Sequence, residues 1–417
     1  MNIYLLFILT IIIGEYLLNV FVESLNVRSA SPRLPEEFSG FYDSEKYRRS
    51  QEYLTVNTHF SLFKSTFFTI VTVSFILAGG FNVFDTLARA VSSNQIIAGI
   101  VFAGLLFSGS LILSTPFSAY HTFVIEERFG FNKTTVKTFI ADMVKTVILG
   151  ACIGGVVLAV IIWFFVQTGE WAWLWCWVVV TLFQLFLLFI APVLIMPFFN
   201  KFIPLEGGEL KETLTRYAQT QKFALAGIFK MDASRRSSKS NAFFTGFGKF
   251  RRIALFDTLI ERHTTDELVS VLAHEIGHYK QGHVTKGIIM SIVTSGLMFY
   301  ILSFFINNRD LFAAFRMHDI SIYASLVFFG FLYQPLNFLV GVIESVVSRK
   351  HEYAADRFAV STYRKPDEFV VALKKLSVDN LSNLTPHPLK VFLSYSHPPV
   401  LERIRAIRHL GIVQPTR

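Results

Sequence analysis

Charged residues are scarce in this sequence. They make up 17% of its 417 residues, whereas 52% are hydrophobic and 45 are phenylalanine. A soluble protein carries about a quarter charged residues. The composition therefore excludes an ordinary soluble globular protein and indicates that much of the surface faces something other than water.

Cysteine is almost absent as well. Its two copies, Cys152 and Cys176, both fall in apolar stretches. Two cysteines in such places exclude a disulfide framework and a cysteine-based zinc motif. We expect both to serve packing only.

The hydrophobic residues gather in seven runs of about 20, the length that crosses a bilayer core as a helix. Lipid offers no partner for free backbone groups, which favours helices, and the alternation of barrel strands is missing. Because the first run lacks a basic leading segment and contains Glu15, we expect a retained anchor rather than a cleaved signal peptide. The runs are residues 2–22, 60–84, 96–117, 144–166, 171–196, 287–306 and 320–342.

These runs predict a mainly α, polytopic membrane protein with four regions. Residues 1–196 hold spans one to five, and residues 197–286 form a long polar loop. Residues 287–345 hold spans six and seven, and residues 346–417 form a polar C-terminal region.

Basic residues are concentrated in the odd-numbered loops between spans and in the C-terminal region, whereas the even-numbered loops are nearly bare. The positive-inside rule then predicts an N-terminus outside and a cytosolic C-terminus. A bacterial inner membrane and the endoplasmic reticulum both fit that orientation. Since topology accounts for the net charge of +9, we expect no nucleic-acid partner.

The long polar loop contains a pattern typical of zinc peptidases, His274-Glu275-Ile-Gly-His278. Thr264 and Glu267 predict a capping box that opens a helix, on which the two histidines lie one turn apart on the same face. Both can therefore reach one metal ion, and Glu275 beside them is placed to take a proton from the attacking water.

A third ligand is expected after the seventh span. Glu352 and Asp356 are again one helical turn apart, so Glu352 completes a His₂Glu set and Asp356 orients a ligand histidine. An exposed acidic face paired with neighbouring arginines is the alternative for these two carboxylates. His283 lies off the face of the paired histidines, and we interpret it as a polar flank. One zinc ion per chain is the expected cofactor.

Two short strands are predicted near this motif, over residues 240–245 and 252–257. Together they form a small β-hairpin. An exposed strand edge beside the histidine helix would hold an extended peptide through main-chain hydrogen bonds.

The chain resembles the type I CAAX prenyl endopeptidases over almost its whole length. These are seven-span zinc proteases that trim isoprenylated C-termini. The resemblance rests on several segments together, namely residues 123–133, 197–202, 237–246, 252–258, 274–278, 352–356 and 396–399.

The resemblance implies roles that spacing alone does not give. His274, His278 and Glu352 would bind zinc in a gluzincin-like site, and Glu275 would be the general base. His397 would polarise the scissile carbonyl, with His387 as its rival, and Asn241 would lie on the strand that holds the substrate. Seven helices enclosing a water-filled chamber are also implied.

Some family members carry His at the position of Lys239 and Tyr at the position of Phe243. These differences leave the peptide preference of this chain open, but they do not affect the metal site. We expect a monomer whose partners are an extended peptide or prenylated protein C-terminus and the lipid bilayer.

Two other functions stay open. One is a quality-control protease that cuts damaged membrane proteins without requiring a prenyl group. The other is a seven-span transporter or receptor with structural zinc. A transporter concentrates polar groups inside its spans, whereas this chain concentrates them in the long loop and the C-terminal region.

Overall fold

Seven long apolar helical segments dominate the computed structural model, which describes residues 2–246 and 251–413. Only 0–17% of the residues in their most apolar windows are buried inside the protein, so most of these apolar side chains keep some exposed surface, as spans in contact with lipid would. The seven predicted spans are thus confirmed. They are Ile3–Arg28, Ser44–Leu77, Gln95–Glu126, Val136–Gln167, Gly169–Phe199, His283–Ser303 and Ile322–Tyr363.

Three of the spans contain π-helical turns. The single-helix spans are α1 (Ile3–Arg28), α2 (Ser44–Leu77), α12 (His283–Ser303) and α14 (Ile322–Tyr363). The third joins α4 (Gln95–Tyr120) to η2 (His121–Glu126), and the fourth joins α5 (Val136–Leu149), η3 (Gly150–Gly154) and α6 (Gly155–Gln167). The fifth joins η4 (Gly169–Trp171), α7 (Ala172–Ile190), η5 (Ala191–Ile195) and α8 (Met196–Phe199).

The second span ends earlier than its hydrophobic run, which was expected to continue to residue 84. Helix α2 stops at Leu77, and α3 (Gly80–Val91) follows after a turn. Gly79 has φ +72°, a left-handed conformation that favours glycine and breaks the helix. Hydrophobicity alone could not locate this break.

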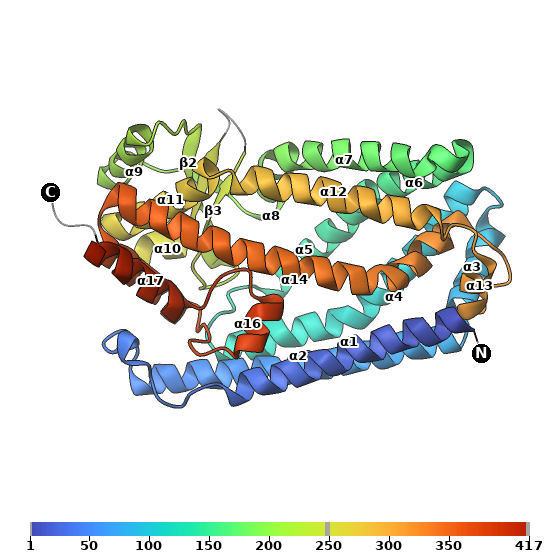
Figure 1. Cartoon of the computed structure of the whole chain (residues 1–417), viewed down its shortest axis with the longest axis horizontal. Coiled ribbons are helices and arrows are strands. Elements are labelled where there is room, and N and C mark those ends of the chain that lie inside the picture. The colour runs from blue at the N-terminus through green and yellow to red at the C-terminus, as the bar shows by residue number, and fades with distance from the viewer. Residues whose placement is uncertain (1, 247–250, 414–417) are drawn as a thin grey trace.

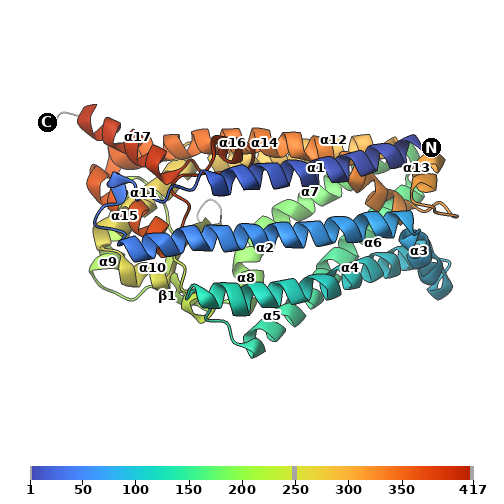
Figure 2. The same ribbon diagram turned by 90° about the horizontal axis from the view of Figure 1, so that it is seen from below.

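The polar regions lie together at one end of the long axis (Figure 1). The start of α1 and the end of α17 (Val400–Val413) lie at opposite ends of that axis, which the view from below also shows (Figure 2). The other short helices are η1 (Glu36–Phe38), α9 (Glu209–Thr220), η6 (Ala233–Arg235), α10 (Asp257–Arg262), α11 (Thr265–Lys280), α13 (Arg309–Ala314), α15 (Pro366–Asp379) and α16 (Pro388–Ser394).

The predicted hairpin is part of a four-stranded sheet of order β1-β2-β4-β3. The strands are β1 (Phe202–Pro204), β2 (Gly227–Met231), β3 (Ala242–Thr245) and β4 (Arg252–Phe256). Strands β3 and β4 are antiparallel, with Ala242 opposite Leu255 and Thr245 opposite Arg252. Because β3 pairs on one side only, its other edge is available for an extended peptide.

Helix α14 runs without a break from the membrane into the polar end, through the division expected between residues 345 and 346. There it packs against α11 and α17, and α15 completes the layer. Leu268, Leu272 and Ile276 of α11 are buried in this core. The seventh span and the layer that carries the candidate site are therefore one continuous piece.

Candidate metal centre

Helix α11 is built as its sequence predicts. Thr264 and Glu267 form the capping box, and the apolar side chains between them and Ile276 face the core. This burial fixes the rotation of the helix, so His274 and His278 both point toward α14.

A close helix crossing brings the third carboxylate to the histidines. A Cβ at Gly277 would lie 3.1 Å from the backbone of Ala355 and 3.1 Å from Phe358 Cβ. The glycine between the two histidines therefore lets α11 and α14 approach at backbone distance. At this spacing Glu352, almost one turn before Ala355, reaches both imidazoles.

The three side chains present a donor set that fits a divalent metal. Nε2 of His274 and Nε2 of His278 are 3.1 Å apart, and each lies 3.1–3.3 Å from an oxygen of Glu352. All three ligand atoms fall within 4.8 Å of one another. Glu352 Oε2 is buried without a hydrogen-bond partner in the described part of the chain. Two imidazoles beside a carboxylate oxygen that lacks a hydrogen-bond donor form a site that suits a cation.

Asp356 orients the first histidine by contacting Nδ1, the ring nitrogen that does not face the other ligands. His274 Nδ1 donates to Asp356 Oδ1 at 2.8 Å, which leaves Nε2 facing the centre. Burial alone lowers the pKa of His274, but the neighbouring carboxylates of Asp356 and Glu352 outweigh burial and raise the pKa from 6.5 to about 9. A proton therefore competes with the metal for this imidazole.

Arg403 of α17 is a site residue that the sequence did not indicate. Its guanidinium donates twice to Asp356, at 2.6 and 2.9 Å, and lies 3.4 Å from Glu352 Oε2. Arg405 and Arg408 follow on the same helix, so composition gave no reason to select Arg403. Helical spacing from the buried Ile404 and Ile407 was the only available signal.

His283 is not the polar flank that was expected. It is 7% exposed, its Nδ1 lies 3.1 Å from Nδ1 of His278, and its ring stacks on His351 at 3.9 Å. Gly282, with φ +69°, makes the tight turn that starts α12 at this point. The sequence-based argument assumed that one helix continued to His283, whereas the turn places His283 on a new helix.

Glu275 and His397 both line a cavity of ≈ 650 Å³ that opens onto the three candidate ligands. The Glu275 carboxylate makes no hydrogen bond or ion pair within the described residues. His397 Nε2 is 3.4 Å from Glu352 Oε1, and Ser396 Oγ is 2.9 Å from its Nδ1. Both polar groups thus line the same space as the three candidate ligands.

Arg349 fixes the segment that leads to His397. It lies on α14, one turn before Glu352, and donates to the carbonyls of Val391 and Tyr395 at 2.8 and 2.6 Å. Arg349 is one of the neighbouring arginines that the exposed-acid alternative would pair with Glu352 and Asp356, but it instead attaches this segment to the helix that carries Glu352.

His387, the rival of His397, lies elsewhere. It is the N-cap of α16, where its Nδ1 accepts from the N–H of Leu389 at 3.2 Å. It does not line the cavity beside the candidate ligands.

The free edge of β3 borders the same cavity, which Ala242, Phe243 and Phe244 line. Asn241 comes directly before the strand and is exposed. Its carbonyl accepts from the N–H of Phe256, and its side-chain oxygen accepts from the N–H of Ala242 at 2.8 Å. The segment that the sequence nominated for peptide binding therefore adjoins the metal-binding face of α11.

Comparisons with known proteins agree with this arrangement. Residues 23–201 match the family described as CAAX prenyl protease N-terminal, five membrane helices, and residues 204–411 match peptidase family M48. CAAX prenyl protease 1 homolog of Arabidopsis thaliana is 38% identical over 386 residues, covering 90% of each chain. CAAX prenyl protease 1 of Saccharomyces cerevisiae is 34% identical over 408 residues, covering 91% of this chain and 89% of its own.

A solved structure is similar as well. The crystal structure of S. mikatae Ste24p matches with a TM-score of 0.92 and 32% identity, covering 97% of this chain and 99% of that chain. With seven spans, a His₂Glu donor set and these relatives, the chain belongs to the CAAX prenyl protease family of M48 peptidases and is an integral-membrane metalloendopeptidase.

Proposed function

We propose that this chain is a zinc endopeptidase that removes the C-terminal tripeptide from isoprenylated proteins. The observation that carries the proposal is the convergence of His274, His278 and Glu352 in a cavity bordered by the free edge of β3. The relatives named CAAX prenyl protease 1 support the prenylated substrate.

In this proposal His274, His278 and Glu352 hold one zinc ion per chain. A zinc ion bound there would supply Lewis acidity for activating water and polarising the scissile carbonyl. Asp356 keeps the proton of His274 on Nδ1, so that Nε2 is free to coordinate, and Arg403 keeps Asp356 ionised and in place.

Glu275 is the general base. Its free carboxylate faces the cavity and takes a proton from the water that attacks the carbonyl carbon, as the motif implies. His397 faces the same cavity and donates a hydrogen bond to the oxygen that gains charge in the transition state. Arg349 keeps the His397 segment in register with Glu352.

The substrate peptide adds to β3 as a further strand. Main-chain hydrogen bonds to the free edge hold it extended, and Asn241 at the start of the strand contacts its backbone. Main-chain pairing depends little on the side chains of the peptide, so the isoprenoid has to supply much of the selectivity for the substrate.

The orientation and assembly belong to the same proposal. The N-terminus lies outside and the polar end is cytosolic, in an endoplasmic reticulum or bacterial inner membrane. The enzyme acts as a monomer, and no nucleic acid takes part. The enclosed chamber implied by the family stays a prediction.

A single comparison tests the proposed function. The purified full-length enzyme is given a farnesylated CAAX peptide and its unprenylated twin, with Glu275→Gln as the inactive control. We expect cleavage of the farnesylated peptide before its last three residues and a much lower kcat/KM for the twin. Equal cleavage of both peptides would favour the quality-control function, and cleavage of neither would refute the proposal.

A further inference from the structure

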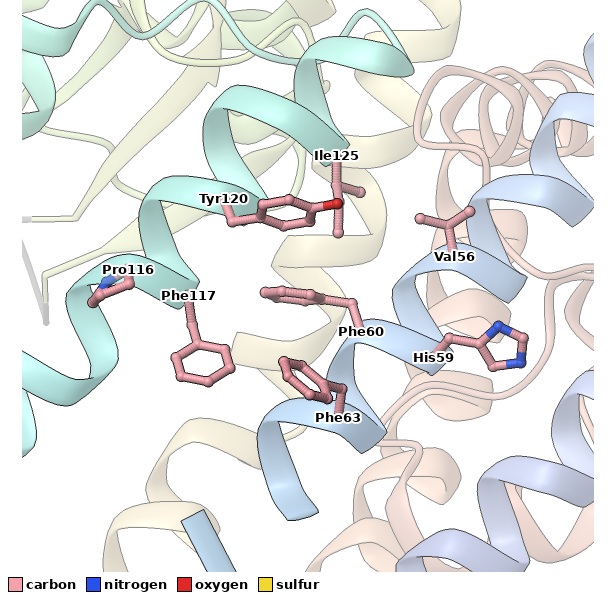
Figure 3. Close-up of a pocket in the computed structure, with 8 residues that line it drawn as sticks. All are labelled: Val56, His59, Phe60, Phe63, Pro116, Phe117, Tyr120 and Ile125. Carbon is pink, nitrogen blue, oxygen red and sulfur yellow. The ribbon is translucent and has the colours of Figure 1, made fainter. Parts of the chain in front are cut away.

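An apolar cleft of ≈ 580 Å³ lies between the second and third spans, away from the metal centre. Phe60 and Phe63 of α2 face Phe117 and Tyr120 of α4 across it (Figure 3). Phe60 stacks on Tyr120 with ring centroids 5.5 Å apart, whereas Phe63 and Tyr120 stay 65% and 52% exposed. The volume falls within the range of small-molecule pockets.

The third span is interrupted beside this cleft. Pro116 lies inside α4 and lines the cleft, and the π-helical segment η2 begins five residues later. A proline removes one helical hydrogen bond, and a π-turn widens the helix, so both bend it. π-Turns are frequent at functional sites. The interruption lies where the wall of the cleft is formed.

A polar group lies beyond one end of the cleft. Val56 and Ile125 line that end, and beyond them Tyr53 and Glu126 are hydrogen-bonded to each other. Lys239 joins the pair, with its Nζ 2.8 Å from Tyr53 Oη and 2.8 Å from Glu126 Oε2. The cleft itself is lined by apolar and aromatic side chains and by His59, and the ion pair of Lys239 and Glu126 lies next to its Val56 and Ile125 end.

Lys239 is also near the catalytic cavity along the chain. It stands three residues before Ala242, the first residue of β3 and part of that cavity. Three residues reach at most roughly 11 Å. The polar group next to the cleft is therefore within reach, through Lys239, of the strand edge on which the peptide is proposed to bind.

We propose that this cleft binds the isoprenoid chain of the substrate while the attached peptide lies on β3. The inference rests on the proposed function. A substrate of that kind is amphiphilic, with a polar peptide joined to a branched apolar chain, and the cleft together with the adjacent polar group has the same order of surfaces. A bilayer acyl chain could also fill the aromatic cleft, but this would not explain why the cleft lies near the peptide-binding edge.

The test measures preference rather than activity alone. The full-length enzyme in lipid nanodiscs is assayed on farnesylated and unprenylated CAAX peptides, and the ratio of the two kcat/KM values is compared between variants. Phe63→Ala and the double variant Phe60→Ala/Phe63→Ala remove apolar contacts. Phe186→Ala on α7 is the matched control, because Phe186 is a 55% exposed phenylalanine on another span.

We expect the preference for the farnesylated peptide to fall about tenfold in Phe63→Ala, further in the double variant, and not in Phe186→Ala. Metal content and melting temperature of each variant verify the fold. Equal losses on both peptides would overturn the inference and leave the proposed function standing, since the cleft would then serve only lipid packing. A wild-type enzyme that cleaves neither peptide would overturn the proposed function and the inference together.

A second measurement locates the chain directly. A peptide carrying a photoreactive isoprenoid is cross-linked to the wild-type enzyme, and the adducts are mapped by mass spectrometry. Adducts on α2 and α4 around Phe60 and Phe117 support the inference. Adducts confined to α12 and α14 would overturn it.

Discussion

Replacement of Arg403 by glutamine should destabilise the protein far more than an equivalent change nearby. The Arg403 side chain is 10% exposed and neutralises two carboxylates, Asp356 and Glu352, whose side chains are 1% and 4% exposed. Its removal leaves buried negative charge without a partner, which costs about 3–5 kcal/mol. In the metal-free protein, His274 is the other group among the described residues that can place a positive charge beside Asp356. Its raised pKa already results from its contact with Asp356.

The measurement is a melting temperature for metal-free and zinc-loaded enzyme. A loss of this size lowers the melting temperature by on the order of 10 °C. Arg405→Gln is the matched control, since Arg405 is exposed on the same helix. Arg403→Lys should fall between them, because an ammonium keeps the charge but cannot donate twice in the geometry of a guanidinium. Zinc should recover part of the loss, because the cation also compensates the carboxylates. If Arg403→Gln and Arg405→Gln have the same melting temperature, the buried ion pair does not stabilise this layer, and our account of Arg403 is wrong.

The other predictions concern the proposed metal site, the catalytic groups and the orientation. Glu352→Ala should abolish zinc binding as measured by metal analysis, whereas Glu344→Ala, in the same cavity and on the same helix, should retain it; full occupancy in Glu352→Ala would remove Glu352 from the ligand set. Glu275→Gln should keep zinc and lose about 10²–10⁴-fold in rate in a peptide assay, since only proton transfer is removed. His397→Ala should lower kcat by about 10²–10³ with KM little changed, and a defect in His387→Ala instead would move the role to that residue. In accessibility labelling of intact membranes, a tag at the C-terminus should be reached from the cytosolic side and one at the N-terminus from the opposite side; two tags on one side would contradict the predicted orientation.

Most of the architecture could be predicted from the sequence because its signals are local or repeated. The seven spans follow from run length, and the position of His274 and His278 follows from a capped amphipathic helix. What the sequence missed depends on contacts between distant segments. Strand β2 pairs in parallel with β4, which no hairpin pattern indicates. Arg403 contacts Asp356 across 47 positions, and its residue type is common in the C-terminal region. The role assigned to His283 failed for a different reason, since a single glycine turn changed which helix carried it.

The unbroken course of α14 has a mechanical consequence. Glu352 lies ten positions beyond the apolar run that ends at Val342, about 15 Å along the same rod. When the thickness of the bilayer changes, the tilt of a spanning helix changes, and Glu352 moves with the helix. Helix α11 is tied to this rod by the close approach at Gly277, so both histidines are carried along. The strand edge of β3 belongs to a different element. It packs against the same core as α11, so a change in bilayer thickness should reorient the metal centre and the strand edge together, while the spacing of the three ligands stays constant.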